Sequence, residues 1–149
     1  MSKNSKFNVL GVMTGTSMDG VDISLINTNG TNFVKIICEK SYKFNKNYQN
    51  IINNLIINKP KNNNKIKEYF LTKDDFVTDI LEKKIILFLK QQKINKKNID
   101  LISISGQTVY HDPSNKISIQ LGNGNKIAKN LKIKTISNLR DNDIKNGGQ

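Results

Sequence analysis

The chain has 149 residues, of which 36% are hydrophobic, so it can form one domain of ordinary size with a lean core. No stretch approaches the roughly 18 consecutive apolar residues of a membrane helix, and the first residues lack the apolar segment of a secretion signal. We therefore expect a soluble cytoplasmic protein without a membrane partner. Its single cysteine, Cys38, can form no disulfide within the chain.

The formal net charge of +12 is compatible with nucleic-acid binding. However, Arg140 is the only arginine, and the lysines are scattered among Asn and Ile residues, which is the composition that an AT-rich genome favours. A protein that reads bases would be expected to use more arginine and to interleave aromatic residues. We predict no nucleic-acid partner, and a basic nucleic-acid scaffold remains the alternative that the charge supports.

The first part of the chain predicts three strands in an antiparallel meander. They cover Phe7 to Met13, Val21 to Ile26 and Phe33 to about Lys40, and Asn29-Gly30 supplies the second turn. The second strand alternates apolar and polar residues, so no helix follows the glycines of the first loop. This loop therefore cannot be a dinucleotide-binding fingerprint or a Walker loop.

The first loop has the composition of a phosphate-binding turn. Its two glycines can take positive φ and expose backbone N–H groups to an anion, and its hydroxyls add donors. Asp19 and Asp22 can hold Mg²⁺ directly or through water. Ordinary turns use the same residue types, so the loop alone does not decide between the two interpretations. The candidate phosphate-binding residues are Gly15, Thr16, Ser17, Met18, Asp19, Gly20, Val21 and Asp22.

Two helices are predicted in the middle of the chain. The first covers Tyr48 to Ile57, and the Asn-, Lys- and Pro-rich tract from Asn58 to Lys65 is a surface loop. The second helix has Thr72 as its N-cap and acidic residues in its first turn. Its apolar residues follow one face as far as Phe88.

Further strands are predicted after these helices. Ile99 to Ile104 is a buried strand, and Ser105 to Thr108 places polar groups at its carboxyl end, where open α/β sheets bind ligands. Ile117 to Leu121 is a strand, Lys126 to Leu131 a helix and Lys134 to Asn138 a strand.

Several segments, spaced along the whole chain in a fixed order, carry a likeness to one known family. They are Gly11 to Asp22, Ser105 to His111, Ile119 to Gly122, Lys126 to Ala128 and Asn138 to Gln149. Together they resemble the family of anhydro-N-acetylmuramic acid kinases. Motifs in register are more specific than any one of them alone.

The resemblance implies an α/β fold: the ribonuclease-H-like domain of the acetate and sugar kinase, heat-shock cognate and actin superfamily, with an incomplete second lobe. In that fold the first hairpin loop grips nucleotide phosphates, so Gly15 to Asp22 would bind ATP, with Mg²⁺ at Asp19 and Asp22. The implied reaction opens the 1,6-anhydro bridge of anhydro-N-acetylmuramic acid with water and moves the γ-phosphate to O6. The product is N-acetylmuramic acid 6-phosphate, an intermediate of cell-wall sugar recycling.

The resemblance also implies residues for this sugar substrate. The hydroxyl of Thr108 can hydrogen-bond ring substituents, and the guanidinium of Arg140 can pair with the lactyl carboxylate. Gln107 and His111 are weaker candidates. A surface ion pair with a neighbouring aspartate is the alternative role for Arg140, and His111 is expected to make local hydrogen bonds at a turn.

The chain departs from the family pattern in residues and in length. Ser105 replaces a histidine, and Asn123 and Asn138 replace acidic residues. Complete members are more than twice as long, and their general-base aspartate and adenosine pocket are expected beyond residue 149, so no catalytic residue is assigned here.

These departures lead us to expect that residues 1–149 are the N-terminal ATPase-like domain, cut inside the Gly-Gly-Gln segment. The chain would be a truncated reading frame or half of a split enzyme with a separately encoded C-terminal half, and inactive alone. The alternative is a non-catalytic module that binds nucleotide or muropeptide.

Overall fold

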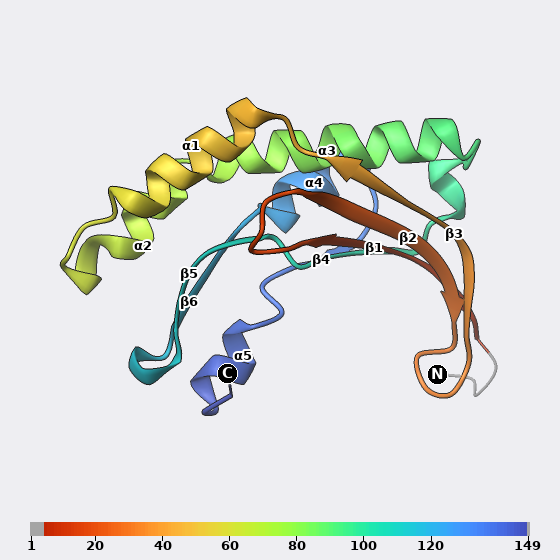
Figure 1. Ribbon diagram of the computed structural model, residues 1–149. Coiled ribbons are helices and arrows are strands. Elements are labelled where there is room, and N and C mark those ends of the chain that lie inside the picture. The colour runs from red at the N-terminus through yellow and green to blue at the C-terminus, as the bar shows by residue number, and fades with distance from the viewer. Residues whose placement is uncertain (1–4, 149) are drawn as a thin grey trace.

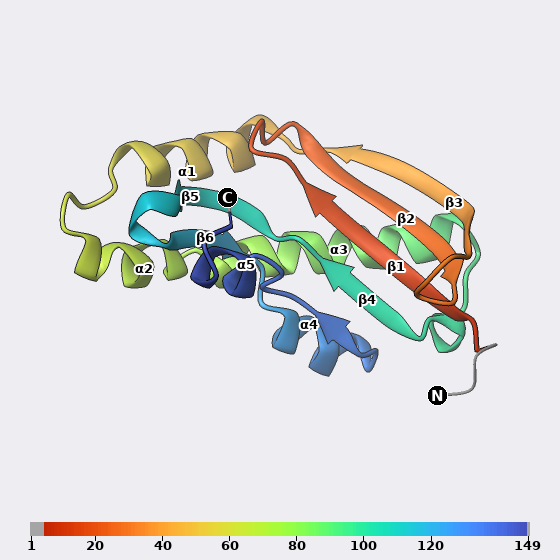
Figure 2. The ribbon, with the colours of Figure 1, turned by 90° about the horizontal axis from the view of Figure 1, so that it is seen from below.

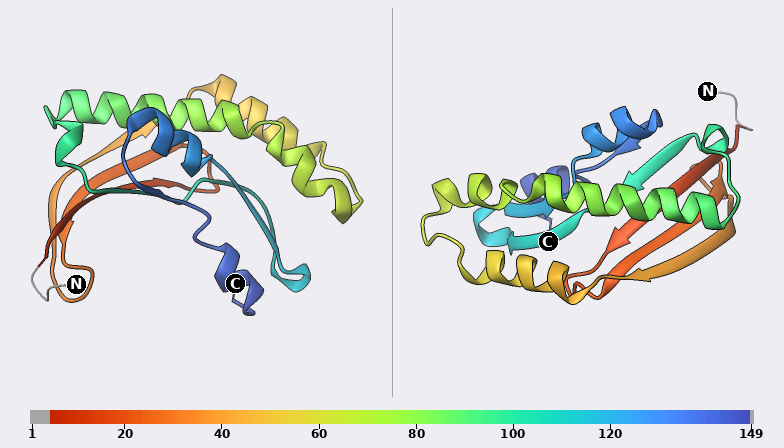
Figure 3. Two further views of the ribbon diagram at one scale, coloured as in Figure 1. Left: turned by 180° about the vertical axis from the view of Figure 1, so that it is seen from behind. Right: turned by 90° about the horizontal axis from the view of Figure 1, so that it is seen from above.

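The computed structural model describes residues 5–148, which form an arched sheet with helices on its convex side (Figure 1). The main sheet has five strands in the order β3-β2-β1-β4-β7, and β5 and β6 form a separate two-stranded sheet. Helices α1, α2 and α3 lie over the convex side, whereas α5 lies on the concave side (Figures 1 and 3). Seen from below, the strands lie in front of α3, so the long helix covers one face of the sheet (Figure 2).

The strands are β1 Phe7–Thr14, β2 Gly20–Thr28, β3 Val34–Lys43, β4 Leu101–Ile104, β5 Gln107–Asp112, β6 Ile117–Leu121 and β7 Thr135–Ile136. The α-helices are α1 Lys46–Ile57, α2 Asn63–Leu71, α3 Asp74–Gln91, α4 Gly124–Leu131 and α5 Asp141–Lys145. Two short 3₁₀ helices, η1 Lys96–Asn98 and η2 Pro113–Asn115, precede β4 and β6.

The predicted meander is confirmed. Strand β2 pairs antiparallel with both β1 and β3, while β4 runs parallel to β1 and β7 parallel to β4. The mixed sheet agrees with the predicted α/β fold class. The parallel pairs bring the carboxyl ends of β1 and β4 to the same edge of the sheet.

Alternation along the strands explains which face of the sheet is covered. Leu10 and Val12 of β1 and Ile23 of β2 are buried with Leu81 and Phe88 of α3 in one core cluster. Burial of each such side chain contributes about 1.5–3 kcal/mol. The intervening residues of β1 and β2 lie on the concave face, where Met13 is 56% exposed.

Helix α2 corrects the prediction for the middle of the chain. Residues 63–71 are helical, so the predicted loop from Asn58 to Lys65 ends early. Thr72 is not the N-cap of α3, because its Oγ1 donates to the carbonyl oxygen of Tyr69 at the end of α2 (2.7 Å) and α3 begins only after Lys73. The helix was not predicted because its first residues are polar, although its apolar residues Ile66 and Phe70 are buried.

The later elements differ from the prediction mainly at their ends. Strand β4 begins at Leu101 because η1 precedes it, and α4 begins at Gly124 rather than Lys126. Strand β7 is shorter than predicted, and Asn138 has left the extended conformation, with a φ of 57°. No helix in residues 5–148 is both long and apolar enough to cross a membrane.

Candidate functional site

The loop between β1 and β2 lies beside the carboxyl end of β4. The backbone N–H of Thr14 donates to Oγ of Ser105 (3.2 Å), and Oγ1 of Thr14 donates to the carbonyl oxygen of Gly106 (2.7 Å). The end of β1, immediately before the segment Gly15–Asp22, is therefore joined directly to the segment Ser105–Thr108. Ser105, a departure from the family pattern, makes one of these links.

The glycines of this loop do not act as predicted. Neither Gly15 nor Gly20 has a positive φ, and Met18 takes the left-handed conformation instead, with a φ of 55°. The need for glycine at position 20 has another cause: a Cβ there would lie 2.6 Å from the carbonyl oxygen of Tyr42 on β3. Close backbone packing, rather than turn geometry, thus requires this glycine.

The loop carbonyls are held by groups from the rest of the chain. The carbonyl oxygen of Gly15 accepts from Nε2 of Gln107 (2.9 Å), and that of Met18 accepts from Nε2 of Gln49 (3.0 Å). The carbonyl oxygen of Asp19 accepts from the backbone N–H of Phe44 (2.9 Å). These bonds fix the loop at its start and at its end.

Anchored carbonyls determine where the loop N–H groups point. In a trans peptide the C=O of one residue and the N–H of the next point in opposite directions. The N–H groups of Thr16 and Asp19 therefore point away from the groups that hold Gly15 and Met18. Backbone N–H groups that point out of a turn are available to an anion.

The two loop carboxylates are exposed and each accepts a hydroxyl hydrogen bond. Asp19 accepts from Oγ of Ser17 (2.8 Å), and Asp22 accepts from Oγ of Ser41 on β3. Asp22 also lines a cavity of about 680 Å³ on the concave side of the sheet, together with Ser105. Both carboxylates can therefore be reached by a ligand.

A polar face on the β5–β6 hairpin contains the predicted sugar residue Thr108. Thr108 is opposite Gln120, and His111 is opposite Ser118. Oγ of Ser118 lies 3.1 Å from Nδ1 of His111 and accepts from Nε2 of Gln120 (2.6 Å). The local hydrogen bond of His111 agrees with the prediction, although His111 lies in a strand rather than a turn.

Ser118 and Gln120 are candidate site residues that the sequence interpretation did not single out. Both line a hollow of about 270 Å³ that also includes Asn138 and Asp141. Arg140, the other predicted sugar residue, lies between these two positions in the chain and is exposed. The alternation of Ser118, Ile119 and Gln120 along β6 was the available signal that both polar side chains share one face.

Gln107 differs from the other predicted sugar residues because its side chain is fully buried (0% exposed). Its Oε1 accepts from the hydroxyl of Tyr48 (3.1 Å), and its Nε2 donates to the carbonyl oxygens of Gly15 and Thr108. It therefore lies behind the loop and has no exposed group to offer a sugar.

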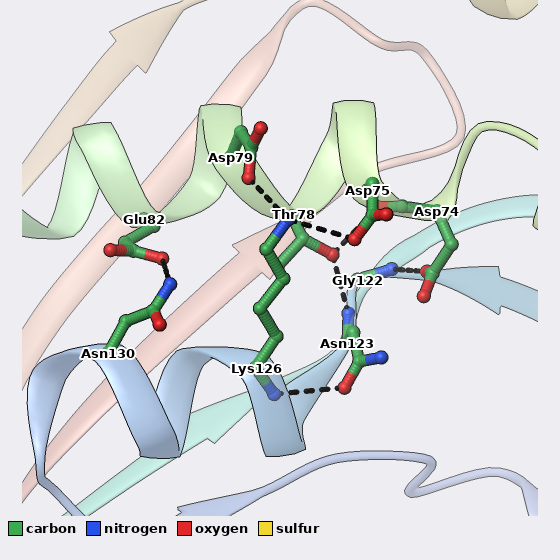
Figure 4. Close-up of polar contacts among 9 residues, drawn as sticks. All are labelled: Asp74, Asp75, Thr78, Asp79, Glu82, Gly122, Asn123, Lys126 and Asn130. Carbon is green, nitrogen blue, oxygen red and sulfur yellow. Dashed lines mark hydrogen bonds and ion pairs between the residues drawn. The ribbon is translucent and has the colours of Figure 1, made fainter.

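A polar seam between α3 and α4 supports the floor of the smaller hollow (Figure 4). The carboxylate of Asp74 accepts from the N–H of Gly122 (2.7 Å), and Oγ1 of Thr78 accepts from the N–H of Asn123 (2.8 Å). Oδ1 of Asn123 accepts from the N–H of Lys126 (3.0 Å) and so caps α4. The departure at Asn123 keeps this capping role, since Asn and Asp are comparable N-caps.

Two ion pairs also connect α3 and α4 at this seam. Nζ of Lys126 lies 2.8 Å from a carboxylate oxygen of both Asp75 and Asp79 (Figure 4). Hydrogen bonds to these two carboxylates raise the pKa of Lys126 above its usual value. Because the three side chains are at least partly exposed, the ion pairs orient α4 rather than contribute much stability.

Comparison with known proteins agrees with this fold. The family model described as anhydro-N-acetylmuramic acid kinase matches residues 7–149. Proteins named anhydro-N-acetylmuramic acid kinase are 37% identical in Pelagibacter ubique, over 96% of this chain, and 34% identical in Sulfurimonas denitrificans, over 94% of it. A relative of the same name in Methylorubrum extorquens is 30% identical over 94% of the chain.

The arched mixed sheet has the ribonuclease-H-like fold of the sugar kinase and actin superfamily. Within that class, the chain belongs to the anhydro-N-acetylmuramic acid kinase family. It spans 38% of the length of the Pelagibacter ubique relative and 37% of that from Sulfurimonas denitrificans.

Proposed function

We propose that this chain supplies the phosphate-binding loop and part of the sugar site of a kinase that uses ATP and water to convert 1,6-anhydro-N-acetylmuramic acid to N-acetylmuramic acid 6-phosphate. The observation that carries the proposal is the loop from Gly15 to Asp19. The carbonyl oxygens of Gly15, Met18 and Asp19 accept hydrogen bonds from the rest of the chain, and the carboxylates of Asp19 and Asp22 are exposed. The family membership of the chain gives the reaction.

For the nucleotide, the N–H groups of Thr16 and Asp19 would bind phosphate oxygens, with the hydroxyls of Thr16 and Ser17 as further donors. The residues present also fit Mg²⁺, which typically takes one or two carboxylates and completes its shell with waters and phosphate oxygens. Asp19 and Asp22 are exposed carboxylates of this kind. Within residues 5–148, no group of three or more His, Cys, Asp and Glu side chains could hold a metal, so the nucleotide would have to supply part of the shell.

For the sugar, Thr108, Ser118 and Gln120 offer hydroxyl and amide groups on one face of the β5–β6 hairpin. The guanidinium of Arg140 suits a carboxylate, such as the lactyl group of a muramic acid, and Lys67 lines the same hollow as Ser118 and Gln120. When bound, Mg²⁺ would neutralise charge on the transferring phosphoryl group, and the loop N–H groups would orient it.

We further propose that residues 1–149 act as the N-terminal ATPase-like domain of the enzyme. The catalytic base and the adenosine pocket would lie in the part of the relatives' length that this chain does not span. This division predicts nucleotide phosphate binding by the chain, but turnover only in the presence of the remaining polypeptide.

Calorimetric titration with MgATP tests the proposal. The wild-type chain should show saturable, Mg²⁺-dependent binding. Asp19→Asn and Asp22→Asn should each weaken it about tenfold, as the loss of about 1.4 kcal/mol would. Glu68→Gln, which removes the same charge from an exposed position on α2, is the matched control and should bind like the wild type.

A second arm uses the polypeptide that corresponds to the rest of the Pelagibacter ubique relative. Sugar phosphate formed only in the mixture would support the proposed division. Saturable binding without product in the mixture would favour the non-catalytic binding module. Absence of MgATP binding by the wild-type chain would contradict the phosphate site.

A further inference from the structure

The side chain of Gln107, at the start of β5, hydrogen-bonds both to the loop between β1 and β2 and to its own strand. Its amide group has two N–H donors and one acceptor oxygen. Nε2 donates to the carbonyl oxygens of Gly15 (2.9 Å) and Thr108 (3.3 Å). Since carbonyl oxygens can only accept, the NH₂ end must face them, and Oε1 must face the hydroxyl of Tyr48 (3.1 Å).

Tyr48 is held firmly enough to orient this amide. Its ring is 1% exposed and stacks on Phe44 at a centroid distance of 4.0 Å and on Phe76 at 5.9 Å. The hydroxyl of Tyr48 has one proton, and it donates this proton in the hydrogen bond to Oε1 of Gln107. Burial raises the pKa of Tyr48, so the hydroxyl keeps that proton across the physiological range.

The same region of the chain holds the far end of the loop. Gln49, the residue after Tyr48, donates to the carbonyl oxygen of Met18, and the N–H of Phe44 donates to that of Asp19. The loop is thus fixed at its start by Gln107 and at its end by Gln49, in the first turn of α1, and by Phe44, two residues before this helix. Of these three residues, Gln107 is the one that belongs to β5.

We infer that Gln107 is a positioning residue, which holds the Gly15–Thr16 peptide with its N–H outward and ties the loop to the strand that carries Thr108. The expected effect of Gln107 on nucleotide binding rests on the proposed function. Without the bond from Nε2, the carbonyl oxygen of Gly15 keeps only the longer bond from the N–H of Met18 (3.3 Å), so the Gly15–Thr16 peptide is freer to turn its carbonyl oxygen, rather than its N–H, toward the phosphate. A carbonyl oxygen repels an anion, so affinity would fall.

Gln107→Glu tests this directly, because it keeps the shape of the side chain and replaces the NH₂ by an oxygen. We expect MgATP affinity to fall about tenfold, the scale of one lost hydrogen bond to a buried polar group. Tyr48→Phe, which removes only the hydroxyl, should give a smaller loss of affinity. In both variants, ¹⁵N relaxation without nucleotide should show increased motion of the Thr16 and Asp19 amides.

A second Tyr–Gln pair provides the matched control. The hydroxyl of Tyr42 donates to Oε1 of Gln91 (2.8 Å), and neither of these side chains bonds to the loop. Tyr42→Phe should therefore change neither MgATP affinity nor the motion of the loop amides, even where its unfolding midpoint shifts as much as that of Tyr48→Phe. This comparison separates positioning of the loop from a general loss of stability.

Unchanged loop motion and unchanged affinity in Gln107→Glu would overturn the inference. If Gln107→Glu does not fold, Tyr48→Phe decides by the same two readouts. If the wild-type chain binds no MgATP, the proposed function fails, but the relaxation measurement still decides whether Gln107 orders the loop. Equal effects of Tyr42→Phe and Tyr48→Phe on the loop amides would also contradict the positioning role of Gln107.

Discussion

Oγ1 of Thr14 donates a hydrogen bond to the carbonyl oxygen of Gly106 over 2.7 Å, although the two residues are 92 positions apart in the chain. This bond ties the end of β1 to the segment that follows β4. It therefore sets the loop between β1 and β2 and the polar face of the β5–β6 hairpin at a fixed distance from each other.

Thr14→Val should weaken this connection without changing the size of the side chain. The variant leaves the Gly106 carbonyl with only the longer bond from Ser105 (3.3 Å), so we expect a loss of about 1–2 kcal/mol in the free energy of unfolding. Urea denaturation measures it. Thr31→Val, in the exposed β2–β3 loop, should stay within about 0.5 kcal/mol of the wild type.

Gly20→Ala should destabilise the protein through contact with β3. The added Cβ would lie 2.6 Å from the carbonyl oxygen of Tyr42, which forces the two strands apart. Overpacking of this kind typically costs about 1–3 kcal/mol. In the control, Gly11→Ala, the Cβ meets its nearest atom at 3.8 Å, so thermal unfolding should show little change. Equal stability of the two variants would contradict the packing argument.

Thr78→Val should loosen the seam between α3 and α4. Thr78 is fully buried, and its Oγ1 accepts from the N–H of Asn123 while donating to the carbonyl oxygen of Asp74. Valine leaves the Asn123 N–H unpaired, at a cost of about 1–3 kcal/mol. Thr78→Ser keeps the hydroxyl and should recover part of the loss, measured by denaturation of both variants. A serine variant no more stable than the valine variant would argue against the hydrogen bond as the cause.

Acid should weaken the turn of the β5–β6 hairpin. Hydrogen bonds from Asn115 and Ser114 lower the pKa of Asp112 to about 2 from its ordinary value of 3.8. The folded state therefore binds this proton less readily, so the stabilisation is present above the unfolded pKa and is lost as pH falls from 3.8 toward 2. Carboxyl NMR titration should show a midpoint near 2 for Asp112. A midpoint at the ordinary value would contradict the hydrogen-bonded arrangement.

Strands β1 and β2 could be predicted from sequence because alternation of apolar and polar residues is typical of a sheet with one buried face. Strand β5, by contrast, was not predicted. Helix α2 was missed because Asn62 and its neighbours have the composition of a loop, and the packing of Ile66 and Phe70 outweighs that local preference. Local preference was also misleading for the loop between β1 and β2, where the positive φ falls on Met18 rather than on a glycine. The anchors of the loop are long-range contacts that no local pattern encodes, as the bond from Gln107 to Gly15 illustrates.

The most direct test of phosphate binding by the loop from Gly15 to Asp22 is an NMR titration of the ¹⁵N-labelled chain with MgATP. The account predicts that the largest amide shifts fall on Thr16 and Asp19 and saturate together, with smaller changes at Thr108. Shifts that fall elsewhere and leave these loop amides unmoved at saturation would contradict it.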